Sequence, residues 1–275
     1  MTLRALYNGL RKVPDLSQSR ALQYGDGVFR TCLIHDGLVV DLDRQIRKLG
    51  SDARALGLTP PPATRLRHEA GILSAPHPQA VLKMILFRSG PGRGYAPHST
   101  RAERLLQVSA VPAYPARCWT RGIRTERSPV TLGSQPRLAG LKHLNRLEQV
   151  LAAGEMSRGV DEVLMADDGD HPVCGSRSNL FWVRRHRLHT PSLERCGVAG
   201  LMREKILGLA RRRGIPAVVS IASWNQIEDA DEIFVCNSLV GIWPVRQFGA
   251  RRWNTPGLVT AVLGGALKHP RLEQP

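Results

Sequence analysis

Lysine is rare in this chain, so each lysine can be weighed separately as a candidate nucleophile. Only six of the 39 basic residues are lysines: Lys12, Lys48, Lys83, Lys142, Lys205 and Lys268. A lysine amine that is removed from water and held beside a helix can form an imine with a carbonyl compound. Lys142 has such a setting, because it follows Ala139 and Gly140 and opens the run KHLNRLEQVLA. Residue type alone still favours a solvated lysine at a helix start. Among the other five, only Lys83 is unusual, since it lies in an apolar strand and could be buried.

The composition is that of a globular protein with neither a metal cluster nor a disulfide framework. Hydrophobic residues make up 42% of the 275 residues, and no apolar run reaches the roughly 18 to 20 residues that cross a bilayer. The five cysteines are scattered, form no CxxC pair and are odd in number. The first residues contain no apolar segment followed by a cleavage site. We therefore expect a cytoplasmic protein with no metal and no membrane partner.

The net charge of +16 raises the question of nucleic-acid binding. Arginine supplies 33 of the positive charges, and the arginines are spread along the chain. No zinc-finger, helix-turn-helix or RNA-recognition pattern accompanies them, so we expect no specific nucleic-acid partner. A positive field of this size would still attract a small anionic substrate.

The first third of the chain is predicted to form an α+β domain. Strands are expected at 27–34 and 38–40, joined by the turn Asp36-Gly37, and at 81–88 and 105–111. Helices are expected from Asp41 or Asp43 to Leu56 and over 64–74. A loop rich in glycine and proline connects the last two strands.

A linker is predicted at 113–121, which gives a smaller domain over 1–112 and a larger, mixed α/β domain over 122–275. The larger domain is expected to contain helices at 142–156, 200–213 and 256–268. Strands are expected at 162–166, 179–183, 217–221, 232–236 and 242–245. The first two of these strands alternate with turn signals, as the strands of a hairpin do.

Six stretches give the chain a resemblance to a known family. They are YGDGVFRT (24–31), SGPGRGY (89–95), SPVTLGSQPRLAGLKHLNRLEQVLA (128–153), SNLFW (178–182), GVAGLMR (197–203) and DEIFVCNSL (231–239). Together they resemble the class IV pyridoxal phosphate (PLP) enzymes, a group that holds branched-chain and D-amino-acid aminotransferases and 4-amino-4-deoxychorismate lyase. The resemblance runs nearly end to end and is closest to the lyase branch, to which the LAGxKHLNRLEQVL run is specific.

The resemblance implies a D-amino-acid aminotransferase-like fold, a homodimer and PLP as the cofactor. It implies that Lys142 carries PLP as an imine and is the catalytic lysine. It also implies that the phosphate of PLP binds backbone N–H groups of Leu201 and Met202 at a helix start, with a second contact from Asn237-Ser238. This is physically reasonable, because a helix N-terminus offers free donors and the positive end of a dipole to a dianion.

Four further residues are candidates for contact with the substrate. Thr31 is expected to hydrogen-bond the substrate or to place a proton, although a threonine in a strand is usually structural. Arg30 and Arg93 are candidate anchors for substrate carboxylates, although a surface role is common for any one arginine. Tyr95 closes the glycine-rich loop, where it is expected either to line the substrate pocket or simply to pack.

Three positions depart from the family pattern. The family usually places a glutamate against the pyridine nitrogen of PLP, five residues before the asparagine of SNLF, and this chain has Cys174 there. A phosphate-binding arginine is replaced by Lys48, with Arg47 beside it. Ser19 takes the place of an aspartate that precedes the YGDG motif.

Cys174 is the most informative of these departures. A carboxylate keeps the ring nitrogen protonated, which transamination needs, whereas a neutral thiol should leave it largely unprotonated. An elimination needs less carbanion stabilisation, because the leaving group takes the electrons away. Cys174 thus counts against an aminotransferase and is tolerable for a lyase. The resemblance to the lyase branch implies a PLP-dependent lyase that converts 4-amino-4-deoxychorismate to 4-aminobenzoate and pyruvate, on the folate route. The alternatives are a class IV amino-acid aminotransferase and a non-catalytic or PLP-free relative. Cys174 is also compatible with a small buried residue that has no role.

Overall fold

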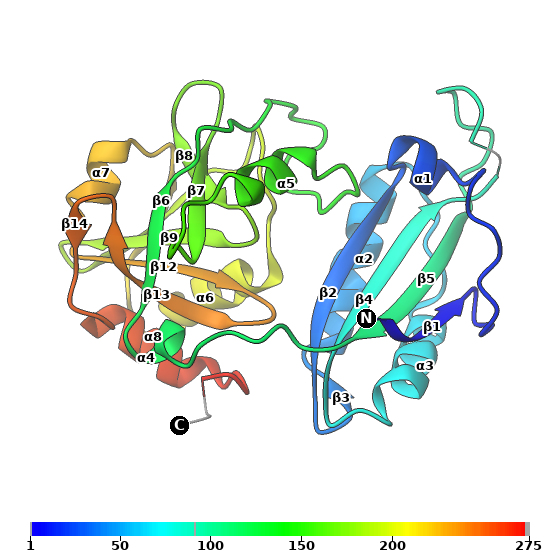
Figure 1. Ribbon diagram of the computed structural model, residues 1–275, viewed down its shortest axis with the longest axis horizontal. Helices are drawn as coiled ribbons and strands as arrows, with labels where there is room; N and C mark the ends of the chain where they lie inside the picture. Colours follow the sequence, from blue (N-terminus) through cyan, green and yellow to red (C-terminus); the bar gives the residue numbers. More distant parts are fainter. Residues whose placement is uncertain (1, 91, 273–275) are drawn as a thin grey trace. The chain divides into compact units, whose positions relative to one another are not determined.

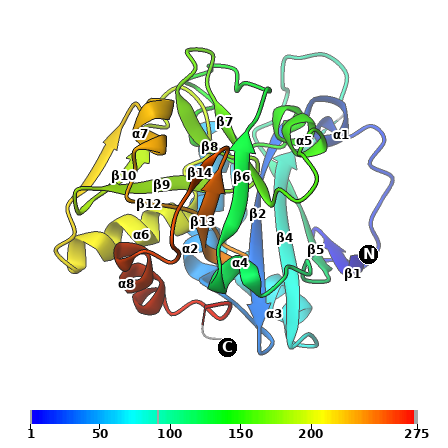
Figure 2. The ribbon, with the colours of Figure 1, turned by 60° about the vertical axis from the view of Figure 1, so that its left-hand side comes forward.

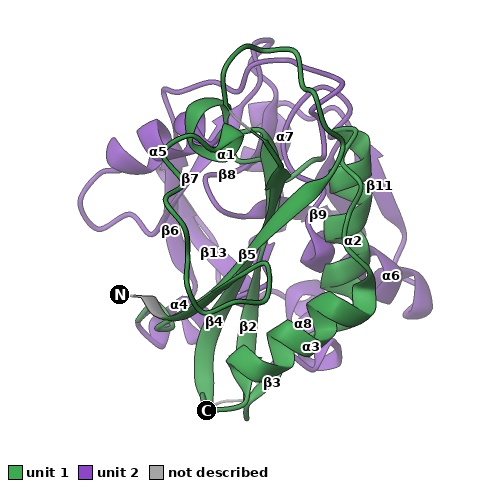
Figure 3. Ribbon diagram, turned by 90° about the vertical axis from the view of Figure 1, so that its right-hand side faces the viewer, with its two compact units in different colours: residues 1–113, 141–145 green, residues 114–140, 146–275 purple. Residues whose placement is uncertain are grey.

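The computed structural model describes residues 2–90 and 92–272 and separates the chain into two compact units. Unit 1 comprises Met1–Ala113 together with Leu141–Asn145, and unit 2 comprises Tyr114–Gly140 together with Arg146–Pro275 (Figure 3). The structure thus divides the chain differently from the expected domains of 1–112 and 122–275. Residues 114–121, expected to be linker, belong to unit 2, and a five-residue segment around Lys142 belongs to unit 1.

Unit 1 is a five-stranded antiparallel sheet with helices on one face (Figure 1). Its elements are β1 (Thr2–Tyr7), α1 (Arg20–Tyr24), β2 (Gly27–His35), β3 (Leu38–Val39), α2 (Leu42–Ala55), α3 (Ala63–Ser74), β4 (Gln79–Arg88) and β5 (Ala102–Ser109). The strand order is β1-β5-β4-β2-β3. The expected turn at Asp36-Gly37 is present, and both residues have the positive φ angles that such tight hairpin turns require.

The two faces of this sheet have different characters. Alternate residues of β2, β4 and β5 point toward α2 and α3 and form one apolar core with residues such as Val28, Leu82, Leu106 and Leu49. The residues between them, which include Phe29, Thr31, Lys83, Leu105 and Gln107, are only partly buried. The second face of the sheet can therefore present polar side chains.

Residues 142–144 form a short strand-like segment that pairs with the edge of β2. The N–H of Phe29 donates to the carbonyl of Lys142 at 2.9 Å, and the N–H of Leu144 donates to the carbonyl of Gly27 at 2.9 Å. Val28 and His143 form an antiparallel bridge between these bonds. The predicted helix over 142–156 is therefore wrong in its first turn, because α5 spans only Leu147–Gly154.

Unit 2 is built on a mixed sheet of nine strands (Figure 2). Its strands are β6 (Ile123–Arg127), β7 (Glu162–Ala166), β8 (Pro172–Gly175), β9 (Asn179–Arg184), β10 (Arg187–Pro191), β11 (Ala217–Ser220), β12 (Glu232–Asn237), β13 (Gly241–Phe248) and β14 (Arg251–Arg252). The helices beside α5 are α4 (Arg117–Thr120), α6 (Leu201–Arg212), α7 (Trp224–Glu228) and α8 (Leu258–Leu267).

The strand order β11-β10-β9-β12-β13-β6-β7-β8 closes on itself through an added pairing between β8 and β9. The hairpin expected from 162–166 and 179–183 is wrong, because β8 lies between these strands and pairs with both. Strands β7 and β12 are almost completely apolar and buried, as expected for strands covered on both faces. Helices α6 and α8 pack on β12 (Figure 2) and form a core with Phe181 and Phe234, whose rings stack 5.0 Å apart.

The structure agrees with the expected α+β character of the first part and the mixed character of the second. Among the described residues, no helix is both long enough and apolar enough to cross a membrane. The same residues contain no group of three or more histidine, cysteine or acidic side chains placed to hold a metal ion.

Candidate active site

Lys142 is fixed by the backbone of β2 and directs its side chain across an aromatic ring. Its carbonyl accepts the N–H of Phe29, as described above, and its Nζ lies 4.6 Å from the centroid of the Phe29 ring. The amine is thus held over an apolar surface, where an ammonium group is less well solvated than in bulk water. This is the setting in which a lysine can act as a nucleophile.

A buried carboxylate lies directly beside the backbone of Lys142. Asp52 on α2 is fully buried, and its Oδ2 accepts the N–H of Lys142 at 3.3 Å. The same carboxylate is ion-paired with the guanidinium of Arg30 and with Lys48, whose Nζ lies 2.9 Å from Oδ1. Asp52 therefore contacts Arg30, Lys48 and the backbone N–H of Lys142.

This network bears on two of the sequence predictions. Arg30, a candidate substrate anchor, is only 3% exposed and is paired with Asp52, so its geometry favours a supporting role beneath the sheet. Lys48, the candidate phosphate contact, keeps 22% of its side chain exposed while it pairs with Asp52. A partly exposed lysine side chain held in this way can still meet an anion, whereas a guanidinium buried in an ion pair cannot without breaking that pair.

Thr31 lies on the partly buried face of unit 1. It is directly opposite Lys83 in the register of β2 and β4, and Phe29 lies two residues away on the same face. Lys83 Nζ lies 4.8 Å from the centroid of the Phe29 ring. One face of the sheet thus brings together Lys142, Lys83 and Thr31 around Phe29.

In unit 2, helix α6 begins with free backbone donors at the two residues predicted to bind phosphate. Its N-cap is Gly200, which has no side chain to cap the helix. Within the part of unit 2 that the structure describes, the N–H groups of Leu201 and Met202 donate to no carbonyl or side chain. A 12-residue helix adds its dipole to these donors, so the site suits a phosphate dianion.

Asn179 shapes the loop that leads into α6. Its Nδ2 donates to the carbonyl of Val198 at 2.7 Å, and its Oδ1 lies so close to Gly200 that a Cβ at residue 200 would overlap it. Gly140 joins the same loop, because its N–H donates to Gly197 and its carbonyl accepts from Ala199, both at 3.0 Å. The chain is thus bonded to the α6 loop two residues before it reaches Lys142.

The turn after β12 is also held by specific contacts. Asn237 Oδ1 accepts the N–H groups of Leu239 and Val240 at 2.9 and 3.0 Å, so its side chain forms the turn itself. The carbonyl of Ser238 lies 3.2 Å from Nε2 of the fully buried His269. Because the Asn237 side chain is used within the turn, the backbone of the turn is the part that could contact a phosphate.

Cys174 is buried on β8 in an apolar cluster with residues such as Met165, Val173 and Cys196. It is paired with Met165 on one side and Asn179 on the other. Burial lowers the pKa of the nearby Arg146 guanidinium, and the Cys174 thiol group opposes that shift. The structure therefore places a buried, poorly solvated thiol in this part of unit 2, next to the asparagine that shapes the α6 loop.

The glycine-rich loop after β4 carries the remaining two candidates. Arg93 is exposed, and Tyr95 is 87% exposed with its ring 5.4 Å from that of Tyr24. Arg20 fastens the loop by donating to the carbonyls of Gly94 and Tyr95 at 2.8 and 3.0 Å. Both candidate side chains are exposed enough to contact a ligand, and Tyr95 also packs against Tyr24.

Comparisons with known proteins agree with the motifs. The sequence pattern of the family described as Amino-transferase class IV matches residues 27–248. The chain belongs to the class IV aminotransferase family. The family resemblance and the expected fold class are thereby confirmed.

Members of the family differ in how closely they match this chain. An aminodeoxychorismate lyase of Vibrio harveyi is 31% identical over 88% of this chain and 90% of its own length. The crystal structure of 4-amino-4-deoxychorismate lyase from Pseudomonas aeruginosa is 38% identical, with a TM-score of 0.91 over 97% of this chain and 99% of that one. A putative branched-chain-amino-acid aminotransferase of Methanocaldococcus jannaschii is 28% identical over 84% of this chain and 81% of its own length.

The sequence analysis did not single out three residues of this candidate site. Asp52 looked like one more polar residue on an amphipathic helix, and nothing near it signalled burial. Phe29 and Asn179 lie within the motifs YGDGVFRT and SNLFW, but neither motif indicates what these two side chains contact. The spacing of Phe29 and Thr31 on one strand face was the one available signal, since alternate residues of a strand share a face.

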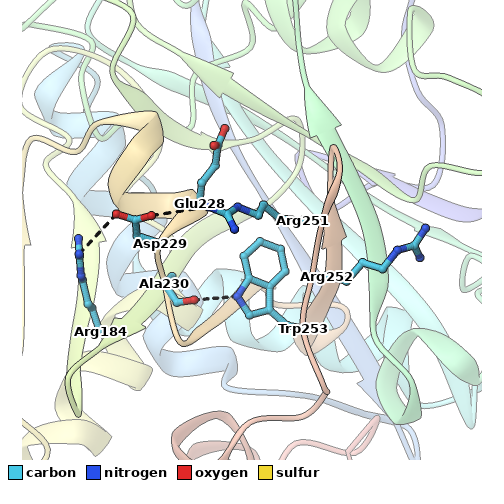
Figure 4. A pocket seen from close by; sticks show the side chains of 7 residues that line it. All are labelled: Arg184, Glu228, Asp229, Ala230, Arg251, Arg252 and Trp253. Carbon is cyan, nitrogen blue, oxygen red and sulfur yellow. Dashed lines mark hydrogen bonds and ion pairs between the residues drawn. The ribbon is translucent and has the colours of Figure 1, made fainter.

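One hollow of unit 2 contains none of these residues. It has a volume of about 360 Å³ and is lined by Arg184, Glu228, Asp229, Ala230, Arg251, Arg252 and Trp253 (Figure 4). Asp229 pairs with both Arg184 and Arg251, at 3.4 and 3.8 Å. These ion pairs offset most of the charge in the hollow. We therefore assign the hollow no part in the chemistry of the family.

Proposed function

We propose that this chain is an aminodeoxychorismate lyase that uses PLP to convert 4-amino-4-deoxychorismate to 4-aminobenzoate and pyruvate. One observation supports the proposal above all: Lys142 holds its amine over Phe29 while Gly140, two residues earlier, is bonded to the loop that opens α6. The nucleophile and the phosphate donors are thus tied to one short stretch of chain. The identities of 31% and 38% to aminodeoxychorismate lyases exceed the 28% to the putative aminotransferase named above.

The residues of this chain suit PLP. Leu201 and Met202 would hold its phosphate through free N–H groups, with Lys48 and the Asn237-Ser238 backbone as further contacts. Lys142 would carry its aldehyde carbon. PLP, when bound, supplies a ring that takes up electrons from the substrate.

The remaining roles fall to side chains on the partly buried face and on the glycine-rich loop. Lys142 Nζ would accept the proton from the ring carbon that bears the amino group of the substrate. Thr31 would hydrogen-bond the substrate and help to place that proton. Arg93 and Tyr95 would contact the substrate carboxylates and ring, and Arg30 would act indirectly, through Asp52. Departure of the enolpyruvyl group leaves an aromatic ring, which makes the step favourable.

Cys174 favours a lyase over an aminotransferase. The thiol sits in an apolar cluster and takes the place of the carboxylate that the family usually has at this position. It would therefore leave the pyridine nitrogen of PLP unprotonated and the ring a weaker electron acceptor. An elimination that forms an aromatic ring tolerates this, whereas repeated transamination does not.

Assembly and location follow from two further features. The apolar side chains Leu147, Val150 and Leu151 of α5 share one helix face and are 76%, 62% and 55% exposed. We propose that a second copy of the chain covers this face in a homodimer. All five cysteines are buried free thiols, which suits the reducing cytoplasm.

The proposed function is tested by two measurements on the purified protein with PLP. Borohydride reduction followed by peptide mapping should place the pyridoxyl group on Lys142. A lactate-dehydrogenase-coupled assay should detect pyruvate release from aminodeoxychorismate. The variant Lys142→Met should lose both signals, whereas Lys12→Met, the same change at an exposed loop lysine, should retain them.

Two outcomes would overturn the proposal. Amino transfer to 2-oxoglutarate without pyruvate release would identify an amino-acid aminotransferase. The absence of any PLP absorbance after incubation with PLP would identify a PLP-free relative.

A further inference from the structure

Two lysine amines of unit 1 share one aromatic ring. Lys142 Nζ and Lys83 Nζ lie 4.6 and 4.8 Å from the centroid of Phe29. The distance between the two nitrogens cannot exceed the sum of these two distances. Each ammonium group therefore lies within the range at which it senses the charge of the other.

The strand register explains why both amines reach Phe29. Lys83 on β4 is directly opposite Thr31, so it lies diagonally from Phe29 on the same face of β2. Lys142 approaches from the other side of β2, where its carbonyl accepts the N–H of Phe29 at 2.9 Å. The backbones on both sides of Phe29 are fixed by ladder hydrogen bonds, so the shared ring follows from the fold.

The residues around Lys83 do little to neutralise its charge. The residues in register with Lys83 are Thr31 on β2 and Gln107 on β5, and both are neutral. Among the described residues, no carboxylate forms an ion pair with Lys83, and burial lowers its pKa. The ring attracts a cation, but a second cation over the same ring must approach the first, so the charge of each amine opposes the charge of the other.

The other charged groups packed around β4 have partners of their own. Arg20 of α1 and Arg88 of β4 both bind Asp26. Glu69 of α3 binds Arg104 of β5, and Arg30 and Lys48 bind Asp52 beneath the opposite face of the sheet. Asp52 meets Lys142 only through its backbone N–H. Glu103 of β5, on the same face of the sheet as Lys83, is bonded to Tyr7 and Ser89. None of these acids forms an ion pair with Lys83.

We propose that Lys83 is a positioning residue that acts on Lys142 through its charge: it disfavours the ammonium form of Lys142 and so keeps that amine nucleophilic near neutral pH. A second cation is a known way to activate a lysine for imine chemistry. The inference rests on the proposed function, in which Lys142 carries PLP. It adds that a residue with no assigned contact to PLP prepares Lys142 for that role.

The test is a titration of individual lysines in the PLP-free protein. Trace acetic anhydride, applied across a series of pH values and read by peptide mass spectrometry, gives the ionisation midpoint of each lysine. The wild type should show a lower midpoint for Lys142 than for the exposed Lys12. Lys83→Met and Lys83→Gln should each raise the Lys142 midpoint by at least about half a pH unit. Lys83→Arg, which keeps the charge, should restore it, and Lys12→Met should leave it unchanged.

The inference is overturned if the Lys142 midpoint is the same in the wild type and in either neutral Lys83 variant with native near-ultraviolet circular dichroism. It is equally overturned if Lys83→Arg shifts the midpoint as far as the neutral variants do, since a charge effect must survive that change. Borohydride mapping of the wild type tests the proposed function separately. Labelling at Lys142 with an unmoved midpoint would reject the coupling alone, and no labelling with a moved midpoint would reject the function alone.

Discussion

Asp52 accepts the backbone N–H of Lys142 at 3.3 Å, so a buried carboxylate and the candidate catalytic lysine are in direct contact. The contact goes to the backbone, which leaves the Lys142 amine to the face of the sheet that carries Phe29. Asp52 therefore fixes the position of the Lys142 backbone. The same carboxylate holds Lys48, so one acid sets the positions of two residues proposed to meet PLP.

Asp52→Asn should destabilise the protein strongly. The change leaves Arg30, which is 3% exposed, without its counter-charge, and breaking a buried pair typically costs about 3–5 kcal/mol. Urea unfolding should show a loss of about 3 kcal/mol, whereas Asp43→Asn should cost less than about 1 kcal/mol. Asp43 is a matched control, because it lies on the same helix in an exposed pair with Arg67. Equal losses for the two variants would mean that the Asp52 network contributes little.

Gly200→Ala should weaken PLP binding. A Cβ at residue 200 would overlap Oδ1 of Asn179 and shift the free N–H groups at the start of α6. Fluorescence titration with PLP should show a dissociation constant raised at least about tenfold, a loss of about 1.4 kcal/mol.

Gly208→Ala is the control for that change, since its Cβ would meet only the end of Arg212 at 3.6 Å. It should preserve PLP binding and stabilise α6 by up to about 1 kcal/mol. Unchanged affinity in Gly200→Ala would show that PLP does not use the start of α6.

Cys174→Glu should change the products. A carboxylate opposite the pyridine nitrogen would keep that nitrogen protonated, so the variant should gain amino transfer to 2-oxoglutarate beside pyruvate release. The absorbance spectrum of bound PLP should change as well. Cys174→Ser, which stays neutral, should keep the products of the wild type.

The same variant also reports on the location of residue 174. A carboxylate at residue 174 would lose its hydration in this apolar cluster, where Arg146 is the nearby cation. Unchanged products and spectra with intact thermal stability would therefore show that residue 174 does not touch the ring of PLP.

Alkaline pH should destabilise the protein through its buried thiols. Burial raises the pKa of Cys32 to about 12 and that of Cys196 to about 11, from an ordinary value of 9.0. Above pH 9 the unfolded chain therefore releases protons that the folded chain retains, and stability falls as the pH rises through this window.

The measurement is urea unfolding at about pH 9 and about pH 10.5 for the wild type and for Cys32→Ala. The loss of free energy between the two pH values should be about 1–2 kcal/mol smaller in the variant, because each ionising group contributes about 1.4 kcal/mol per pH unit. The variant also carries a cavity, but a cavity lowers stability equally at both pH values. Identical pH dependence would show that Cys32 ionises as readily in the folded protein as in the unfolded chain.

Local signals made much of the fold predictable. Strands β2 and β4, the turn Asp36-Gly37 and the start of α6 after Gly200 each follow from residue types within a few positions of one another. The family motifs added the site residues in the same way, because each motif is a short continuous stretch. The positions of Leu201 and Met202 at a helix start could be predicted without information from the rest of the chain.

The features that escaped prediction depend on residues far apart in the sequence. The run from Lys142 has apolar residues at helical spacing, yet its first residues satisfy their backbone groups on β2, more than 100 residues earlier. Asp52 is polar on a helix, and only the arrival of Arg30 from a neighbouring strand makes its burial tolerable. Neither pairing leaves a trace in the local pattern.

Residues 141–145 are synthesised well after the strand edge that they cover. A ribosome finishes β1 to β5 roughly 30 residues before it makes the segment that covers β2, which at 5–20 residues per second is a delay of roughly a few seconds. During that interval the nascent chain exposes part of a strand edge, and such edges recruit other chains. A truncated product that stops at residue 113 should therefore aggregate, and a peptide with the sequence of residues 141–145 should reduce that aggregation when it is added to the translation reaction.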